Sequence, residues 1–225
     1  MVKNIFILEE HLNKNKIDLF SYSHVRTYHA CRPTNIEDYM KQGIKSINKK
    51  TVLQEAIQRM KSDDVSESEI REQFLQDWKD FDDIHKQVWL ALNKDVFFEG
   101  AGHYLIYGSE FINALAMKIG CRYILKNVGL PTIFQCDVPI GEISPSQIFD
   151  LENMIENGYI SDLTIAVHEV LPEDISDYWH PVEEIDDPYY YGLKYKANYH
   201  KLVAAGYYSS KIVQETDGSE DYEVN

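Results

Sequence analysis

The stretch "TYHACRPTNIEDYMKQGI", residues 27–44, puts a β-prone run directly before a helix that a glycine ends. Residues 27–32 have the composition of a strand, and Pro33 and Thr34 mark its exit. Asn35 is a suitable N-cap for the helix, and Gly43 stands where a left-handed C-terminal cap is expected. The stretch therefore predicts a strand followed at once by a short helix.

A helical block is expected between residues 51 and 94. Thr51 and Gln54 have the spacing of a capping box, which favours a helix start at this point. Apolar residues then recur at intervals of three and four over residues 70–92, the pattern of a long amphipathic helix. Three aromatic residues of this expected helix, Trp78, Phe81 and Trp89, are expected in the core.

The rest of the chain predicts short strands separated by helices. The expected strands are residues 103–107, 131–139 and 163–167, and the expected helices are one capped by Ser109 and one running from Ser144 to Asn157. Because these elements lack regular βαβ spacing, an α+β fold is favoured over a doubly wound sheet. We expect one domain over residues 1–215, with the block 51–94 as a helical insertion, and a disordered acidic tail over 216–225.

Charge and composition limit the classes of partner. The chain of 225 residues carries 22 basic and 37 acidic side chains, a formal net charge of −15. This charge disfavours nucleic acid and anionic membrane surfaces as partners. No apolar stretch has the length of a signal-peptide core or a membrane span, so a cytoplasmic location is expected.

Several chemistries lack their motif in this sequence. The cysteines are an odd number, three, and have no C-x-x-C spacing, which predicts reduced thiols and neither a disulfide framework nor a zinc site. The sequence contains no G-x-S-x-G elbow, P-loop or G-x-G-x-x-G fingerprint. Serine hydrolase, kinase and Rossmann dehydrogenase functions are therefore set aside.

Three blocks together resemble a known superfamily. "YHACRPTNIEDYMKQGI" is similar to the first strand and helix of ADP-ribosyltransferases of the diphtheria-toxin and poly(ADP-ribose)-polymerase type, in which a histidine precedes a glycine by about fourteen residues, as His29 precedes Gly43. "GHYLIYGSEFINALA" resembles the second block, a tyrosine followed by a small-residue helix. "IFQCDVPIGEI" resembles the third block. The blocks occur in the family's order and cover about half of the chain.

The resemblance implies a split, mostly antiparallel β-sheet with a cleft that binds NAD. It implies that His29 contacts a ribose of NAD, that the backbone of Ala30 holds the nicotinamide amide, and that Tyr104 stacks on the nicotinamide ring. Further residues expected to line or assist this pocket are Arg32, Tyr107 and Ser109.

The family's glutamate has no direct counterpart. An ungapped match puts Thr164 at that position, so we assign the catalytic acid to Asp162, which lies on the same face of the expected strand. Glu169 is the alternative, but it falls on the apolar face. Ala30 also replaces the family's glycine, although alanine still offers its N–H and C=O groups.

The resemblance implies an NAD-dependent ADP-ribosyltransferase that releases nicotinamide and transfers ADP-ribose to an unidentified macromolecular acceptor. NAD is its substrate, and no metal is expected. Two alternatives stay open. One is an NAD glycohydrolase, in which water replaces the acceptor. The other is an inactive binding protein with this fold, with a protein inhibitor or partner, as in a bacterial defence or toxin–antitoxin system.

Overall fold

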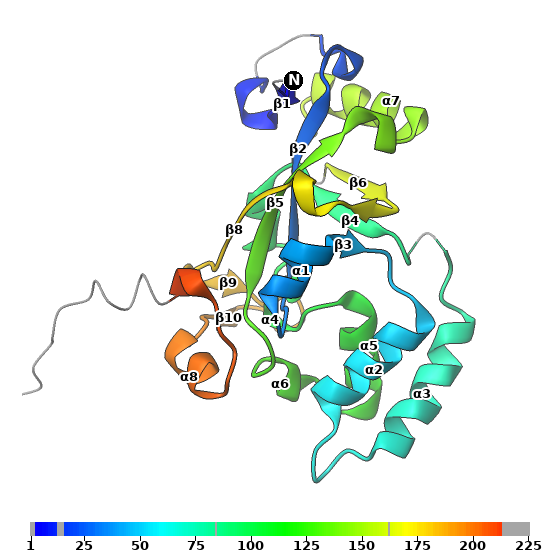
Figure 1. The fold of residues 1–225 in the computed structure, drawn as a ribbon, viewed down its shortest axis with the longest axis vertical. Coiled ribbons are helices and arrows are strands. Elements are labelled where there is room, and N and C mark those ends of the chain that lie inside the picture. The colour runs from blue at the N-terminus through cyan, green and yellow to red at the C-terminus, as the bar shows by residue number, and fades with distance from the viewer. Residues whose placement is uncertain (1–2, 13–15, 84, 162, 213–225) are drawn as a thin grey trace, which may run out of the picture.

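The computed structural model describes residues 3–12, 16–83, 85–161 and 163–212, and they form a mixed α and β fold around one main sheet (Figure 1). The strands are β1 (Ile5–Phe6), β2 (His24–Cys31), β3 (Ile44–Lys45), β4 (Val88–Ala91), β5 (Thr132–Pro139), β6 (Thr164–Val167), β7 (Glu169–Val170), β8 (Ile175–Trp179), β9 (Ile185–Asp186) and β10 (Lys194–Tyr195). The α-helices are α1 (Ile36–Gln42), α2 (Lys49–Met60), α3 (Glu67–Lys79), α4 (His103–Ile106), α5 (Glu110–Ile119), α6 (Arg122–Leu125), α7 (Pro145–Glu156) and α8 (Tyr199–Ala204). The 3₁₀ helices are Leu8–Glu10, Leu19–Ser21, Lys94–Phe97, Ile140–Glu142 and Pro172–Asp174.

The main sheet has the strand order β6-β4-β2-β5-β8, and its strands are antiparallel to their neighbours. Strand β1 adds to the start of β2 in parallel. The mostly antiparallel α+β class expected from the sequence is therefore confirmed. Strands β3 and β7 form a separate small pair, as do β9 and β10.

The sheet is split between β2 and β4. Strand β2 pairs with β5 over its full length, from His24 to Cys31, whereas its register with β4 contains the single pair Tyr28 and Ala91. Strand β4 in turn pairs with β6 at four positions. Beyond Tyr28 the two strands therefore diverge, and the sheet consists of a larger and a smaller part joined at one residue pair.

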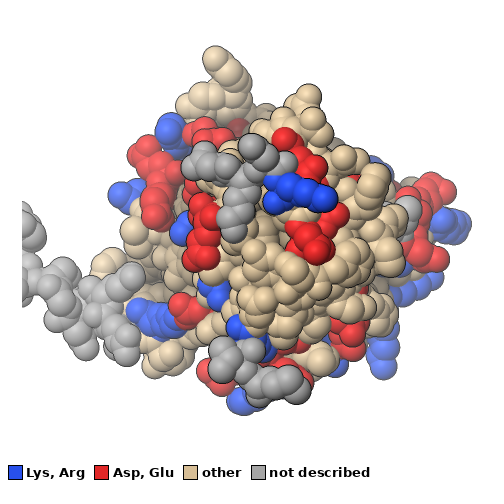
Figure 2. Space-filling view, turned by 90° about the horizontal axis from the view of Figure 1, so that it is seen from above, with Lys and Arg blue, Asp and Glu red and all other residues tan. Residues whose placement is uncertain are grey.

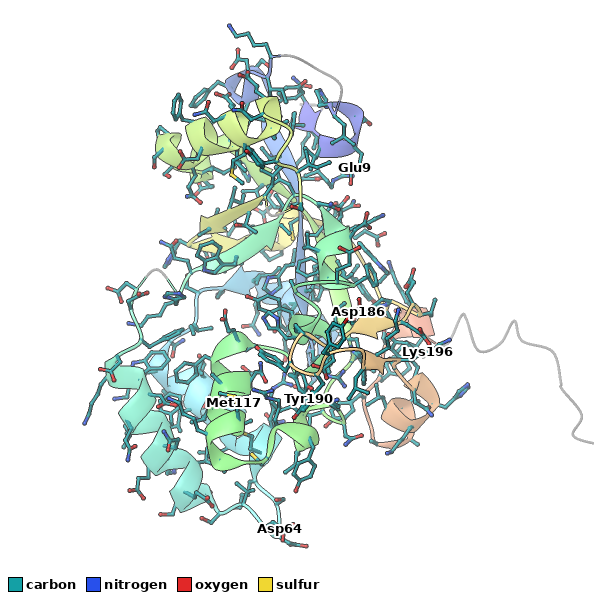
Figure 3. All side chains as sticks on the ribbon, turned by 180° about the vertical axis from the view of Figure 1, so that it is seen from behind. Glu9, Asp64, Met117, Asp186, Tyr190 and Lys196 are labelled. Carbon is teal, nitrogen blue, oxygen red and sulfur yellow. The ribbon has the colours of Figure 1, made fainter. Side chains whose placement is uncertain are left out.

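The two faces of the sheet carry separate cores. On one face, Phe134, Leu90 and Ile165 pack with residues of α7 and of the N-terminal segment. On the other face, Tyr28 and Ile133 pack with residues of α2, α3 and α5. In Figure 1, α2, α3, α5 and α6 gather at one end of the molecule and α7 lies at the other, and the view from behind in Figure 3 shows the same arrangement.

Residues 27–44 form a strand end followed at once by a short helix, as predicted, but Gly43, with ψ of −172°, does not have the left-handed helical conformation expected of its cap. The side chain of Asn35 accepts a hydrogen bond from the N–H of Glu37, and α1 ends at Gly43 with φ of 77°. A Cβ atom at this position would lie 2.1 Å from the carbonyl oxygen of Val170 on β7. Position 43 therefore requires glycine both for its backbone angle and for the close approach of β7.

Three sequence predictions of secondary structure are wrong. The stripe over 70–92 is not one helix, because α3 ends at Lys79 and residues 88–91 form β4, so the block 51–94 contains a sheet strand. The run Val88, Trp89 and Leu90 is rich in residues that favour strands, and its sheet partners decide the outcome. Residues 103–106, expected as a strand, form the single-turn helix α4. Helix α2 also starts earlier than expected, with Asn48 as its cap.

Acidic and basic side chains are interspersed on the face seen in Figure 2, and the blue side chains drawn there do not gather into one continuous patch. Within the described ranges, no helix combines the length and apolar character needed to span a membrane. The acidic tail 216–225 lies outside the residues that the structure describes.

Arg32, directly after β2, is buried and binds four backbone carbonyls. Its Nε donates to the carbonyl of Val128 at 2.9 Å, and its Nη2 donates to those of Lys126 and Gly129 at 2.8 and 2.9 Å. Its Nη1 donates to the carbonyl of Leu105 at 2.9 Å and to Tyr195 Oη at 3.0 Å. This side chain therefore joins the end of β2 to α4, to the loop before β5 and to β10.

Replacing Arg32 with methionine removes all of these donors while keeping much of the side-chain volume. We expect the free energy of unfolding to fall by about 3 kcal/mol or more, because several buried carbonyls lose their partners together. Urea denaturation measures this loss. The matched control is Arg71→Met, since Arg71 is exposed on α3 and pairs with Glu67 in the same helix. Equal losses in the two variants would contradict the role given to Arg32.

Candidate functional site

A cavity of about 430 Å³ opens where β2 and β4 diverge. Residues from both strands line it, together with residues of α1, of α2 from Thr51 to Arg59, and of the segment that carries α4 and the start of α5. Of the residues expected in the site, His29, Ala30, Arg32, Tyr104 and Ser109 all line this cavity. The first two of the three sequence blocks are therefore brought together in space, whereas no residue of "IFQCDVPIGEI" lines the cavity.

The backbone of Ala30 faces the gap between the strands. Successive residues of a strand direct their N–H and C=O groups to opposite neighbours. The Leu92 N–H, directly after β4, donates to the carbonyl of Leu163, directly before β6, so the backbone groups of Leu92 face β6. Those of its neighbour Ala91 therefore face β2. Its partner Tyr28 must then face β4, and so must Ala30, two residues further on. Ala30 thus presents one donor and one acceptor to the cavity at a position that has no register partner on β4.

His29 is held by its Nδ1 nitrogen, which lies 3.1 Å from the carbonyl oxygen of Trp89 on β4. A carbonyl only accepts, so Nδ1 carries the proton and, in the neutral ring, Nε2 is an acceptor. Burial lowers the pKa of His29, and the bond to Trp89 only partly opposes this. The ring is therefore neutral near pH 7, with an acceptor nitrogen on a residue that lines the cavity.

Tyr104 and Glu110 form a pair on the opposite wall. Tyr104, in α4, donates from its hydroxyl to the Glu110 carboxylate at 3.3 Å. Glu110 is the first residue of α5 and is exposed. Burial raises the pKa of Tyr104, and the nearby Glu110 raises it further, so the hydroxyl stays protonated and can keep donating. The cavity therefore holds an aromatic ring with a carboxylate fixed beside it.

Two of the expected residues use their side-chain donors in structural contacts. The Arg32 guanidinium donates to the backbone carbonyls around it, so these donors are not left for a ligand. Tyr107 does not line the cavity; its hydroxyl donates to Asp187 Oδ2 at 2.5 Å within a buried contact. Asp162, assigned as the catalytic acid, lies outside the described residues, whereas Thr164 lines the cavity.

Sequence reasoning missed three residues of this site. Glu110 adjoins the expected cap Ser109, and its place at a helix start next to a candidate pocket was the available signal. Trp89, expected in a helical core, is 40% exposed and lines the cavity from β4. Arg59, in the second helix, is buried and also lines the cavity. For Trp89 and Arg59, no local pattern indicated the location.

Cysteine and metal chemistry find no support at this site. Cys31 lines the cavity, but burial raises the pKa of its thiol to about 12, so it is not a thiolate nucleophile at neutral pH. Cys31, Cys121 and Cys136 are free and buried. Among the described residues, no group of three or more His, Cys, Asp or Glu side chains is arranged to hold a metal ion.

Comparison of the chain with protein-family models, with curated proteins and with solved structures found no match.

We expect His29 to make stability depend on pH. The unfolded chain takes up a proton near pH 6.5, whereas the folded His29 takes it up only at a lower pH. The free energy of unfolding should therefore decrease as the pH falls below about 6.5. His29→Asn can keep a donor to the Trp89 carbonyl without a titrating ring, so its decrease between pH 7 and pH 5 should be smaller. Urea denaturation at several pH values measures both. His103 and His180, whose pKa values burial also lowers, remain in both proteins, so parallel curves would contradict the assignment.

Tyr107→Phe tests whether Tyr107 is structural. Asp187 would lose the hydroxyl and keep Lys126, whose Nζ lies 3.3 Å from Asp187 Oδ2. We expect the free energy of unfolding to fall by roughly 1–3 kcal/mol because a buried carboxylate loses a donor. Ligand binding in the cavity should be unchanged in the folded protein. A large loss of binding without loss of stability would place Tyr107 in the site instead.

Proposed function

We propose that this protein is an NAD-dependent ADP-ribosyltransferase-like enzyme that cleaves the bond between nicotinamide and ribose. The observation that carries the proposal is the Ala30 peptide, which faces the gap between β2 and β4 without a register partner on β4. A primary carboxamide needs one donor and one acceptor side by side, and the N–H and C=O of one strand residue offer this pair. Nicotinamide carries such a carboxamide.

Other groups that line the cavity suit the nicotinamide ring and the ribose of NAD. Tyr104 and Trp89 offer aromatic surface to a nicotinamide ring, and the neutral His29 offers Nε2 as an acceptor for a ribose hydroxyl. A volume of about 430 Å³ falls in the range of small-ligand sites and can take the nicotinamide nucleoside half of NAD.

Cleavage develops positive charge on the ribose. The C1′–N bond breaks with its electron pair going to nicotinamide, which leaves as a neutral molecule, and C1′ becomes part of an oxocarbenium-like ion. A fixed carboxylate stabilises that ion. Glu110, oriented by Tyr104, supplies this carboxylate in our proposal. An acceptor nucleophile then forms the new bond to C1′ and loses a proton.

Nicotinamide release from NAD tests the proposal, with the purified protein and its His29→Asn and Glu110→Gln variants. We expect release to fall roughly tenfold in the first variant, which lacks the Nε2 acceptor. In the second variant, which lacks the negative charge, we expect a fall of roughly a hundredfold. Glu67→Gln is the matched control, because Glu67 is also the first residue of a helix and lies outside the cavity.

The products separate the possible outcomes. ADP-ribose attached to a macromolecule of a cell extract indicates transfer, and free ADP-ribose alone indicates hydrolysis. Binding of NAD without release indicates an inactive binding protein. If NAD does not bind, or if release is the same in all variants, the proposed cleft has no part in NAD chemistry.

A further inference from the structure

Arg59 has an unused donor in a buried environment. The side chain is 5% exposed, its Nε donates to Glu55 at 2.8 Å, and its Nη2 donates to the carbonyl of Arg32 at 2.5 Å. Its Nη1 is buried and has no hydrogen-bond partner among the described residues. A buried charged group with a missing partner costs free energy, so a ligand that supplies an acceptor there is favoured.

This donor lies beside the start of α5. A Cβ atom placed on Gly108 would be 3.8 Å from Arg59 Nη1, and Gly108 directly precedes the N-cap residue Ser109. Gly108 has φ of 87°, which allows the sharp turn from α4 into α5. Arg59, Ser109 and the first residues of α5 all line the same cavity.

The N-terminus of α5 is also uncapped. The helix has ten residues, and the Ser109 side chain makes no capping hydrogen bond. In α2, α3 and α7, by contrast, the side chains of Asn48, Ser66 and Ser144 each accept a hydrogen bond from a first-turn N–H. The first N–H groups of a helix have no partner within the helix, and together with the helix dipole they attract anions.

We propose that Arg59 Nη1 and the first N–H groups of α5 form a binding site for a phosphoryl group within the cavity. A phosphoryl group suits it because its oxygens can accept both from a guanidinium and from several N–H groups. Glu55 lies on the far side of the guanidinium at Nε, and the Glu110 carboxylate is engaged by the Tyr104 hydroxyl. Neither carboxylate therefore occupies Arg59 Nη1, which has no partner among the described residues and is left for a ligand.

The site lies next to the proposed carboxamide site. Arg59 is fixed to the carbonyl of Arg32, which is two residues beyond Ala30, about 7 Å along an extended chain. One ribose can bridge a spacing of this size. Assigning the phosphoryl group to the diphosphate of NAD rests on the proposed function, whereas the anion site itself does not.

The test compares Ser109→Asp with Ser109→Asn. Both residues can cap α5, so both variants should fold, but only aspartate brings a negative charge to the proposed site. Isothermal titration calorimetry with nicotinamide, nicotinamide mononucleotide and inorganic pyrophosphate gives the affinities. Relative to Ser109→Asn, we expect Ser109→Asp to bind the mononucleotide and pyrophosphate roughly tenfold more weakly and nicotinamide equally well. Arg59→Gln, if folded, should show the same selectivity.

The outcomes separate this inference from the proposed function. If pyrophosphate binding depends on Ser109 and Arg59 but nicotinamide and NAD do not bind, the anion site stands and the proposed function fails. If NAD is cleaved in a manner that depends on His29 while none of these variants changes affinity for the mononucleotide, the anion site fails. Absence of binding of both phosphate compounds to the unmodified protein also overturns the anion site. Competition between pyrophosphate and the mononucleotide would confirm that both occupy one site.

Discussion

Five hydrogen bonds from one buried guanidinium hold together segments that no β-ladder connects. Arg32 ties the end of β2 to α4, to the loop before β5 and to β10. Its acceptors are carbonyls and a hydroxyl, so the charge is solvated by backbone dipoles, and the geometry of the surrounding turns becomes fixed. Arg59 adds a second guanidinium by binding the carbonyl of Arg32. The end of β2 is therefore the anchor for both walls of the cavity.

This anchoring explains how a sheet can contain a gap in its middle. Strand β2 is paired with β5 along its whole length, which frees its other edge to part from β4 after Tyr28. His29 then spans the gap with a single contact to Trp89 instead of a backbone ladder. The same divergence directs the backbone of Ala30 into the cavity. Residues His29 and Ala30 thus have proposed chemical roles, and Arg32, two residues later, has a structural one.

The sequence predicted those features that depend on local chemistry. The α+β class, the strand that contains His29 and the helix from the Asn35 cap to Gly43 follow from side-chain pattern and capping. Features that depend on residues distant in the sequence were not predictable in this way. The residues of β4 fit a helical periodicity, and they form a strand because they pair with β2 and β6. The side chain of Arg32 was assigned to ligand binding, but carbonyls from about a hundred residues later surround it. Glu110 and Arg59 enter the site only through the way α2 and α5 pack together.

The single residue pair between β2 and β4 also bears on how the protein opens. The smaller part of the sheet, β4 with β6, adheres to the rest mainly through side chains such as Leu90 and Ile165 in the shared core. Units joined by few backbone bonds tend to unfold locally at lower free energy than the whole domain. Amide hydrogens of β4 and β6 should then exchange with solvent together, ahead of those between β2 and β5. A ligand that contacts both His29 and Trp89 would slow this exchange. Binding in the cavity would therefore be detectable as slower amide exchange in β4 and β6, which lie partly outside the cavity.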